Sequence, residues 1–185
     1  MKIIAGTHRS RVIDVPKGSV TRPTTSQVRA CVFNICQGSI EGSHFVDIFA
    51  GSGAMGLEAL SRGAKVCTFI DQDLEACLCI KKNIERLHFE EQSLLLRHNA
   101  HLALSKIKEP FDICYIDPPY DVDALHILQE LDQMPLLAEK ATVFYETRYQ
   151  KDITQAFDTL KNLVLASSRK IGDTMLHHFY KGRVP

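Results

Sequence analysis

Long apolar runs are missing from this sequence. None approaches the roughly 20 residues that cross a membrane, and the opening MKIIAGTHRS has too short an apolar run for a signal peptide. The sequence also lacks internal repeats and low-complexity segments. The six cysteines form no C-x-x-C pair and the eight histidines show no ligand spacing, so we expect reduced thiols, surface or hydrogen-bonded histidines and no metal. These absences lead us to expect a cytoplasmic, monomeric globular protein without membrane attachment. A length of 185 residues suits one domain.

An excess of charge is also missing, because 22 basic and 22 acidic residues cancel. The distribution is nevertheless uneven. Residues 1–30 carry a net charge of +5, which is six basic residues less Asp14, and the remainder carries −5. Such an end can hold a polyanion on a neutral body, and a solvated basic face explains the same charges equally well. The six basic residues are Lys2, Arg9, Arg11, Lys17, Arg22 and Arg29.

Strand-like and helix-like segments alternate from residue 44 onwards. This alternation predicts a parallel, doubly wound α/β sheet. Two strand-like segments around Gly172-Asp173, 163–171 and 174–180, predict a hairpin that adds an antiparallel edge and completes seven strands. In the helix expected over 73–87, one apolar side should contain Leu74, Cys77, Leu78 and Ile84. The other expected strands are 44–49, 65–70, 93–98, 111–116 and 140–146, and the other helices 54–63, 100–107 and 122–134.

The first 40 residues lie outside this alternation. The segments KIIAG and RVIDV predict a short β-hairpin, and a helix should follow that runs to about Gln37. We therefore divide the chain into an N-terminal extension, 1–40, and a main domain, 41–185, within one compact unit. The candidate caps of this helix are Thr24, Thr25 and Ser26, and its apolar positions at helical spacing are Val28, Val32, Phe33 and Cys36.

The stretch VDIFAGSGAMG, residues 46–56, contains the pattern G-x-G-x-x-G after an expected strand. Glycines allow a sharp turn and close approach of a ligand, and the following helix directs its N–H groups at that space. Asp71, 18 residues after Gly53, can accept hydrogen bonds from ribose hydroxyls. These signals fit NAD and S-adenosylmethionine alike, and a tight turn without ligand is the plain alternative. Asp47 favours a methyltransferase, although a buried cap or turn role is open to it.

The stretch YIDPPY, residues 115–120, separates the two cofactors. Asp117 ends an expected strand, where doubly wound sheets place their ligands, and the two prolines remove N–H donors. Carbonyl and carboxylate acceptors beside the flat face of Tyr120 suit a planar base with an exocyclic amine. Two acceptors can align that amine with an electrophilic methyl group and stabilise its developing charge. The pattern favours S-adenosylmethionine over NAD, with a proline-stiffened loop as the alternative.

A wider set of motifs resembles the RsmD family of bacterial enzymes, which methylate guanine N2 in 16S rRNA. The motifs are IIAG, RPTTSQVRACVFNI, DIFAGSGAMGLEALSRGA, IDPPY and RKIGDTMLHHF. The resemblance implies a Rossmann-like S-adenosylmethionine-dependent methyltransferase fold and a target in the helix 31 loop. Ser26 and Ala30 stand where the family often has acids, and Asn99 stands where many methyltransferases have Asp.

The resemblance assigns site residues by position. It implies a base-binding, catalytic set of Asp117, Pro118 and Tyr120. It implies a cofactor-binding set of Asp47, Gly51, Gly53, Gly56 and Asp71, to which we add Asn99. It makes Arg22, Thr24 and Arg29 candidates for RNA contact, and the basic charge adds Arg9 and Arg11.

The expected function is transfer of a methyl group from S-adenosylmethionine to a guanine N2 amine of 16S rRNA, free or in an assembling small subunit. Splayed bases in single-stranded loops are accessible to such enzymes. An N6-adenine DNA methyltransferase is the alternative enzyme, but 185 residues leave little room for its target-recognition segment. A non-catalytic RNA-binding protein on the same fold is the alternative from another class.

Overall fold

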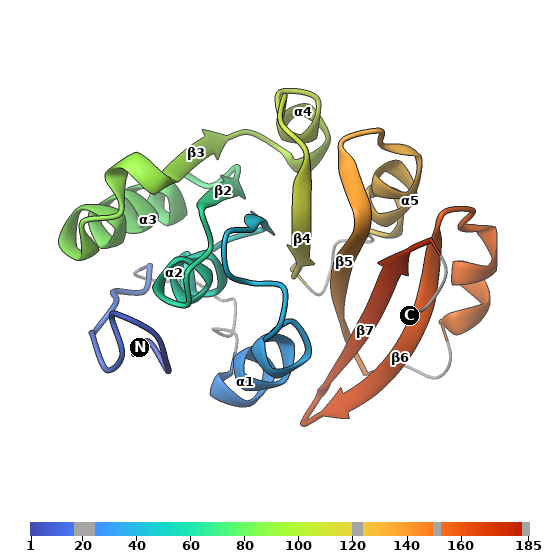
Figure 1. Cartoon of the computed structure of the whole chain (residues 1–185), viewed down its shortest axis with the longest axis horizontal. Coiled ribbons are helices and arrows are strands. Elements are labelled where there is room, and N and C mark those ends of the chain that lie inside the picture. Colours follow the sequence, from blue (N-terminus) through green and yellow to red (C-terminus); the bar gives the residue numbers. More distant parts are fainter. Residues whose placement is uncertain (17–24, 120–123, 150–152, 183–185) are drawn as a thin grey trace.

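A computed structural model of the chain describes residues 1–16, 25–119, 124–149 and 153–182. The described strands form one sheet in the order β3-β2-β1-β4-β5-β7-β6 (Figure 1). Pairs among β1 to β5 are parallel, whereas β7 is antiparallel to both β5 and β6. The predicted seven-stranded, mostly parallel sheet with an antiparallel end is confirmed. Its strands are β1 (His44–Ile48), β2 (Val66–Asp71), β3 (Ser93–Arg97), β4 (Phe111–Ile116), β5 (Leu137–Arg148), β6 (Leu163–Ile171) and β7 (Thr174–Lys181).

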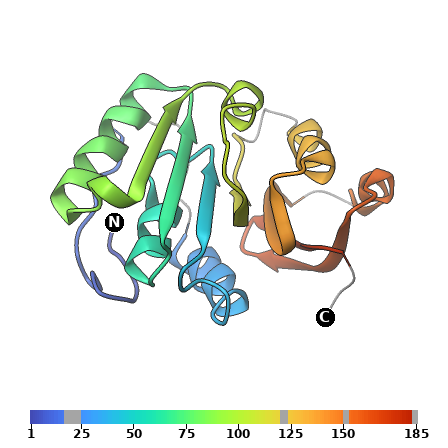
Figure 2. The ribbon, with the colours of Figure 1, turned by 45° about the horizontal axis from the view of Figure 1, so that its top comes forward.

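Helices cover both faces of this sheet (Figures 1 and 2). Each face has its own apolar cluster: Phe45 of β1 packs into one, and Val46 and Ile48 pack into the other, because successive strand residues alternate. Within the described ranges, no helix has the length and apolar content of a membrane span. The first face carries α1 (Ser26–Ile35), α2 (Ala54–Ser61) and α3 (Leu74–Leu87), and the second carries α4 (Ala100–Leu104), α5 (Leu125–Gln133) and the 3-10 helix η2 (Thr154–Thr159); a further 3-10 helix, η1 (Glu90–Gln92), precedes β3.

Helix α1 begins as the sequence predicts. Thr25, one of three candidate caps, accepts a hydrogen bond from the backbone N–H of Val28 at 3.3 Å. The expected apolar positions Val28, Val32, Phe33 and Cys36 are all buried. The helix therefore packs as an amphipathic element on the sheet.

Helix α3 buries two of the four residues predicted for its apolar side, Cys77 and Ile84. Leu74 and Leu78 are 49% and 52% exposed. The polar Asn83 takes a core position, because its amide bridges backbone groups of Asp14 and Ser52. The prediction was therefore wrong for Leu74 and Leu78, and it did not include Asn83, because an apolar pattern does not count a polar residue. The buried side consists of Ala76, Cys77, Ile80, Asn83, Ile84 and Leu87.

The N-terminal segment shares the core of the main domain. The predicted hairpin is reduced to one antiparallel bridge, between Lys2 and Val12. Ile3 and Ile13 are nevertheless buried in the same apolar cluster as Phe45. Residues 1–16 thus pack as part of the first face.

All six cysteines are free. Of the two adjacent histidines on β7, His177 agrees with the expectation and His178 does not. His177 and His178 are both buried, and burial lowers the pKa of each to about 4. The ring of His177 is hydrogen-bonded to the hydroxyls of Thr147 and Ser168. The ring of His178 stacks on Phe144, and its Nε2 has no hydrogen-bond partner within the described ranges. The expectation of a surface or hydrogen-bonded residue is therefore wrong for His178.

Candidate active site

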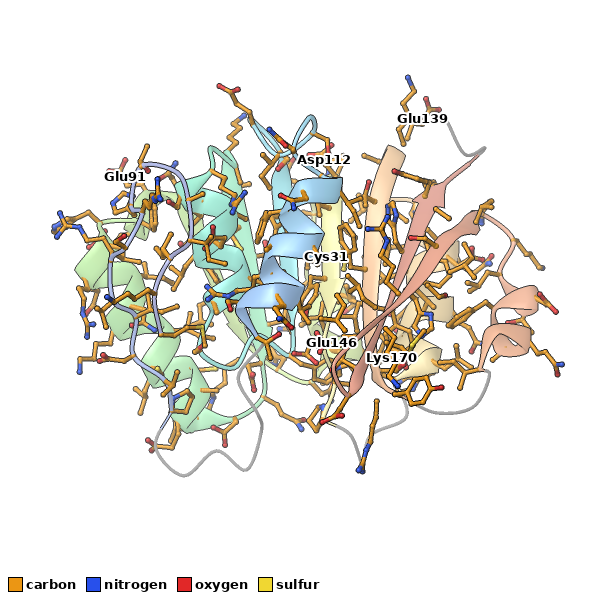
Figure 3. All side chains as sticks on the ribbon, turned by 90° about the horizontal axis from the view of Figure 1, so that it is seen from below. Cys31, Glu91, Asp112, Glu139, Glu146 and Lys170 are labelled. Atoms are coloured by element: carbon orange, nitrogen blue, oxygen red, sulfur yellow. The ribbon has the colours of Figure 1, made fainter. Side chains whose placement is uncertain are left out.

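The carboxyl ends of four parallel strands meet at one edge of the sheet. Strand β1 leads into the glycine loop, β2 ends at Asp71, β3 leads to Asn99, and β4 leads to Asp117. The strand order reverses between β1 and β4, which is the switch point where such sheets bind ligands. Figure 3 labels Asp112 and Glu139 at the opposite, amino edge.

The glycine loop has the backbone that its sequence requires. Gly51 and Gly53 have φ values of +57° and +77°, a left-handed region that residues with a Cβ rarely adopt. The N–H of Gly51 donates to the Asp71 carboxylate at 2.8 Å, and the N–H of Asp73 donates to its other oxygen at 2.9 Å. Asp71 is therefore fixed against the loop, and each of its oxygens keeps acceptor capacity for a hydroxyl.

Gly56 and Asp47 lie beneath the loop. A Cβ on Gly56 would lie 2.3 Å from the ring of Phe69 and 2.4 Å from the sulfur of Cys67, so glycine lets α2 pack on β2. Asp47 is 2% exposed and accepts the N–H of Gly56 at 3.0 Å. Burial raises the pKa of Asp47 to about 8. These contacts give Gly56 a packing role, and they give Asp47 the buried turn role that the sequence leaves open.

A cavity of about 290 Å³ opens beside Asp71 and Asn99. Its volume lies near the lower end of ligand pockets, roughly 300–1,000 Å³. Asn99 caps α4 here, because its side-chain oxygen accepts the N–H of Leu102 at 2.9 Å. The position of Asn99 directly before a predicted helix was a signal for this role. Phe49 and His126 also line the cavity, and sequence reasoning missed both.

The backbone of Phe49 is unusual, with φ of +63°. A bulky residue in the left-handed region is a rare outlier, and such outliers cluster at ligand-binding loops. Phe49 directly precedes the glycine loop and lines the cavity. We therefore include it among the candidate cofactor-contacting residues.

Asp117 lies directly after β4, and its N–H donates to the carbonyl of Ile48 at 3.3 Å. This bond ties it to the end of β1, just before the glycine loop. Pro118 is buried. Tyr120 lies outside the described residues. The structure thus brings Asp117 to the same edge as Asp71 and Asn99, although Asp117 does not line the cavity.

A buried polar pair lies under this part of the sheet. The hydroxyl of Tyr115 on β4 donates to the carboxylate of Glu146 on β5, and both residues are buried. Burial raises the pKa of each group above its usual value. Sequence reasoning missed this pair, because KATVFYE reads as an ordinary strand with a terminal acid.

The candidate RNA-contacting residues separate in the structure. Arg29 is 3% exposed, donates to the carbonyl of Lys2 at 3.0 Å and lies 3.6 Å from the Glu58 carboxylate. The prediction that Arg29 contacts RNA therefore disagrees with its burial in an internal ion pair. Arg22 and Thr24 lie outside the described residues.

Arg9 and Arg11 are exposed but distant from Asp117. Their turn is bonded to Ser61 at the end of α2, and His8 packs on Phe89 with ring centroids 4.5 Å apart. Both contacts lie at the amino edge, about 17–20 Å across the sheet from the carboxyl edge.

A family model described as "Conserved hypothetical protein 95" matches residues 1–181. Ribosomal RNA small subunit methyltransferase D of Escherichia coli K12 is 33% identical over 83% of this chain and 77% of its own length. The protein of that name from Haemophilus influenzae is 33% identical over 83% and 81%. The chain belongs to the RsmD family.

Solved structures of similar chains support the methyltransferase fold. The Escherichia coli protein yhhF has a TM-score of 0.84 and 30% sequence identity, with 98% of both chains covered. A ribosomal protein L11 methylase from Lactobacillus delbrueckii has a TM-score of 0.75 at 17% identity, and this likeness concerns the fold alone. The chain has the Rossmann-like fold of S-adenosylmethionine-dependent methyltransferases.

Proposed function

We propose that this protein transfers a methyl group from S-adenosylmethionine to the exocyclic N2 amine of a guanine in 16S rRNA, in the helix 31 loop. The placement of Asp117 at the switch point, bonded to the end of β1 beside the glycine loop, carries this proposal. The relatives named ribosomal RNA small subunit methyltransferase D support RNA as the substrate. A monomer in the cytoplasm suits such a substrate.

The cavity residues fit the cofactor. Asp71 presents acceptors for ribose hydroxyls, and the N–H groups that begin α2 can face the carboxylate of a methionine moiety. The amide of Asn99 faces the same cavity as a neighbour for the adenine ring. When bound, S-adenosylmethionine supplies an electrophilic methyl group on a sulfonium.

The chain's own residues act on the base amine. Asp117 and the carbonyl of Pro118 accept hydrogen bonds from its two N–H groups, and Tyr120 provides a stacking face. Since the amine lone pair is delocalised into the ring, positioning and charge stabilisation by acceptors lower the barrier. Loss of one such acceptor costs about 3 kcal/mol, or roughly a hundredfold in rate.

Single-turnover methylation with both substrates saturating tests this role. Asp117→Ala should lose roughly a hundredfold in rate, with Asp117→Asn intermediate because its amide oxygen still accepts without charge. Asp112, at the other end of β4, offers the matched control, and Asp112→Asn should retain the rate (Figure 3). A near-normal rate for folded Asp117→Ala would remove Asp117 from the mechanism and favour a non-catalytic RNA-binding protein.

The target atom needs a separate test. A synthetic RNA hairpin with the loop sequence, in which inosine replaces the target guanine, lacks only the exocyclic amine. Methylation should disappear on this RNA and persist on the guanine version, placed in a small-subunit particle if free RNA is inactive. Methylation of the inosine RNA, or N6-methyladenine in the product nucleosides, would refute the N2 assignment.

A further inference from the structure

Basic and aromatic side chains gather where β5 ends beside the turn between β6 and β7. Arg148 and Tyr149 end the β5 segment, and Arg169 and Lys170 lie near the end of β6. All four are exposed. The segments are joined, because Arg148 pairs with Thr174 and the N–H of Tyr149 donates to the carbonyl of Asp173 at 2.8 Å. We call these four residues the β6–β7 surface.

The β6–β7 surface lies at the carboxyl edge of the sheet. Ile116 of β4 is in register with Tyr145 of β5, so Asp117 follows β4 at the level where β5 continues towards Arg148. Figure 3 shows Glu146 and Lys170 near each other, away from the edge marked by Asp112. The surface therefore borders the methyl-transfer site.

Its charges are arranged for an anionic partner. Lys170 Nζ lies 3.7 Å from the centroid of the half-exposed Tyr149 ring, a cation–π contact. Within the described ranges, neither Arg169 nor Lys170 forms an ion pair with a carboxylate, and Arg169 lies 4.0 Å from the sulfur of Cys31 on α1. Asp173, in the turn between β6 and β7, is exposed and acidic. The β6–β7 surface as defined carries three cations, Arg148, Arg169 and Lys170, and is therefore positive.

Exposed aromatic faces beside cations are the combination that binds single-stranded nucleic acid, since bases stack and phosphates pair. We propose that the β6–β7 surface binds the RNA nucleotides flanking the target base. This inference rests on the proposed function and assigns a role to RKIGD, whose residues have no part in the cofactor site. It also places RNA binding at the carboxyl edge, unlike Arg9 and Arg11.

The test measures binding of a fluorescein-labelled RNA hairpin with a single-stranded loop across a salt series. Arg169→Gln/Lys170→Gln should lower the slope of log affinity against log salt by about 1.4, at about 0.7 per phosphate contact. Lys106→Gln/Lys108→Gln removes the same charge beyond α4 at the amino edge and should leave the slope unchanged. Arg9→Gln/Arg11→Gln should change it less than the β6–β7 variant does.

Substitutions of Tyr149 test the β6–β7 surface independently of its charges. Tyr149→Ala should weaken binding roughly tenfold, while Tyr149→Phe keeps the stacking face and the affinity. Steady-state methylation of the same RNA should show a raised KM with kcat preserved. If the double variant does not fold, the Tyr149 pair decides.

The outcomes separate this inference from the proposed function. If the wild-type protein methylates RNA and the variants keep its salt slope, RNA affinity and KM, the proposed role of the β6–β7 surface alone is overturned. A wild-type protein that binds RNA with the expected variant losses but transfers no methyl group would overturn the proposed function alone. Absence of RNA binding by the wild type would overturn the β6–β7 surface.

Discussion

Glu58 on α2 bonds the N-terminal segment to the main domain, and its replacement should strongly destabilise the protein. Its carboxylate is fully buried and accepts the N–H groups of Ile4 at 2.7 Å and Ala5 at 3.0 Å. It also accepts from Arg62 at 2.8 Å and lies 3.6 Å from the guanidinium of Arg29. Glu58→Ala removes the acceptor of two backbone N–H groups and the counterion of two arginines.

The size of the expected loss of stability follows from the burial of Arg29. Arg29 is 3% exposed, so loss of Glu58 leaves a buried cation without its counterion. Removing one partner of a buried ion pair costs about 3–5 kcal/mol, which lowers the melting temperature by roughly 6–20 °C in a chain of this size. Glu58→Gln should lose less, because one oxygen still accepts.

Urea unfolding followed by circular dichroism measures the effect, and hydrogen exchange at Ile4 and Ala5 reports the local attachment. Glu85→Ala provides the control, since that exposed glutamate pairs only loosely with Lys81 at 4.0 Å and should change stability by under about 0.5 kcal/mol. A loss below about 1 kcal/mol for Glu58→Ala would refute the reasoning. Glu58→Leu/Arg29→Met should recover only part of the loss, because the buried cation is gone but the N–H groups of Ile4 and Ala5 still lack their acceptor.

Three further changes have defined outcomes. His178→Phe should reduce the stability that the protein loses as the pH falls from 6.5 to 4. Over that range the buried ring of His178, with a pKa of about 4, stays largely neutral in the folded protein, whereas the same ring takes up a proton in the unfolded chain. Urea unfolding of both proteins at the two pH values measures the difference. Tyr115→Phe should cost about 1–3 kcal/mol by removing one of the side-chain donors to the buried Glu146 carboxylate, and Tyr115→Phe/Glu146→Leu should recover part of it in the same assay. Gly56→Ala should cost about 1–3 kcal/mol or more by thermal melting, whereas Gly38→Ala, where a Cβ meets nothing within 4 Å, should not; equal melting temperatures would contradict the packing role.

Local signals in the sequence predicted most of the fold. The strand and helix positions agree because alternation, helical spacing and caps act over a few residues, as at Thr25 before α1. The place of β7 between β5 and β6 is a long-range pairing that no local pattern contains. The buried side of α3 was predicted only in part, for Cys77 and Ile84, because the buried Asn83 has partners 31 and 69 residues away.

The site was predicted in outline rather than in detail. The glycine turn and the convergence of Asp71, Asn99 and Asp117 follow from strand order and glycine chemistry. The number of basic residues in the first 30 positions does not distinguish Arg29, which is buried in an internal ion pair, from the exposed arginines. Burial and pairing depend on which elements meet, so charge along the sequence does not predict charge on the surface.

Because β7 lies between β5 and β6, this part of the sheet is completed only late in synthesis. Strand β6 pairs with β7 alone, and one side of β5 also waits for β7, so this half of the sheet stays open until residue 181 has been made. Strand β5 is complete at residue 148 and β7 at residue 181, and the ribosome adds 33 residues in between, which takes roughly 2–7 seconds at 5–20 residues per second. During that interval the edge of β5 that pairs with β7 is unpaired, and the emerging chain is a substrate for aggregation or for a chaperone.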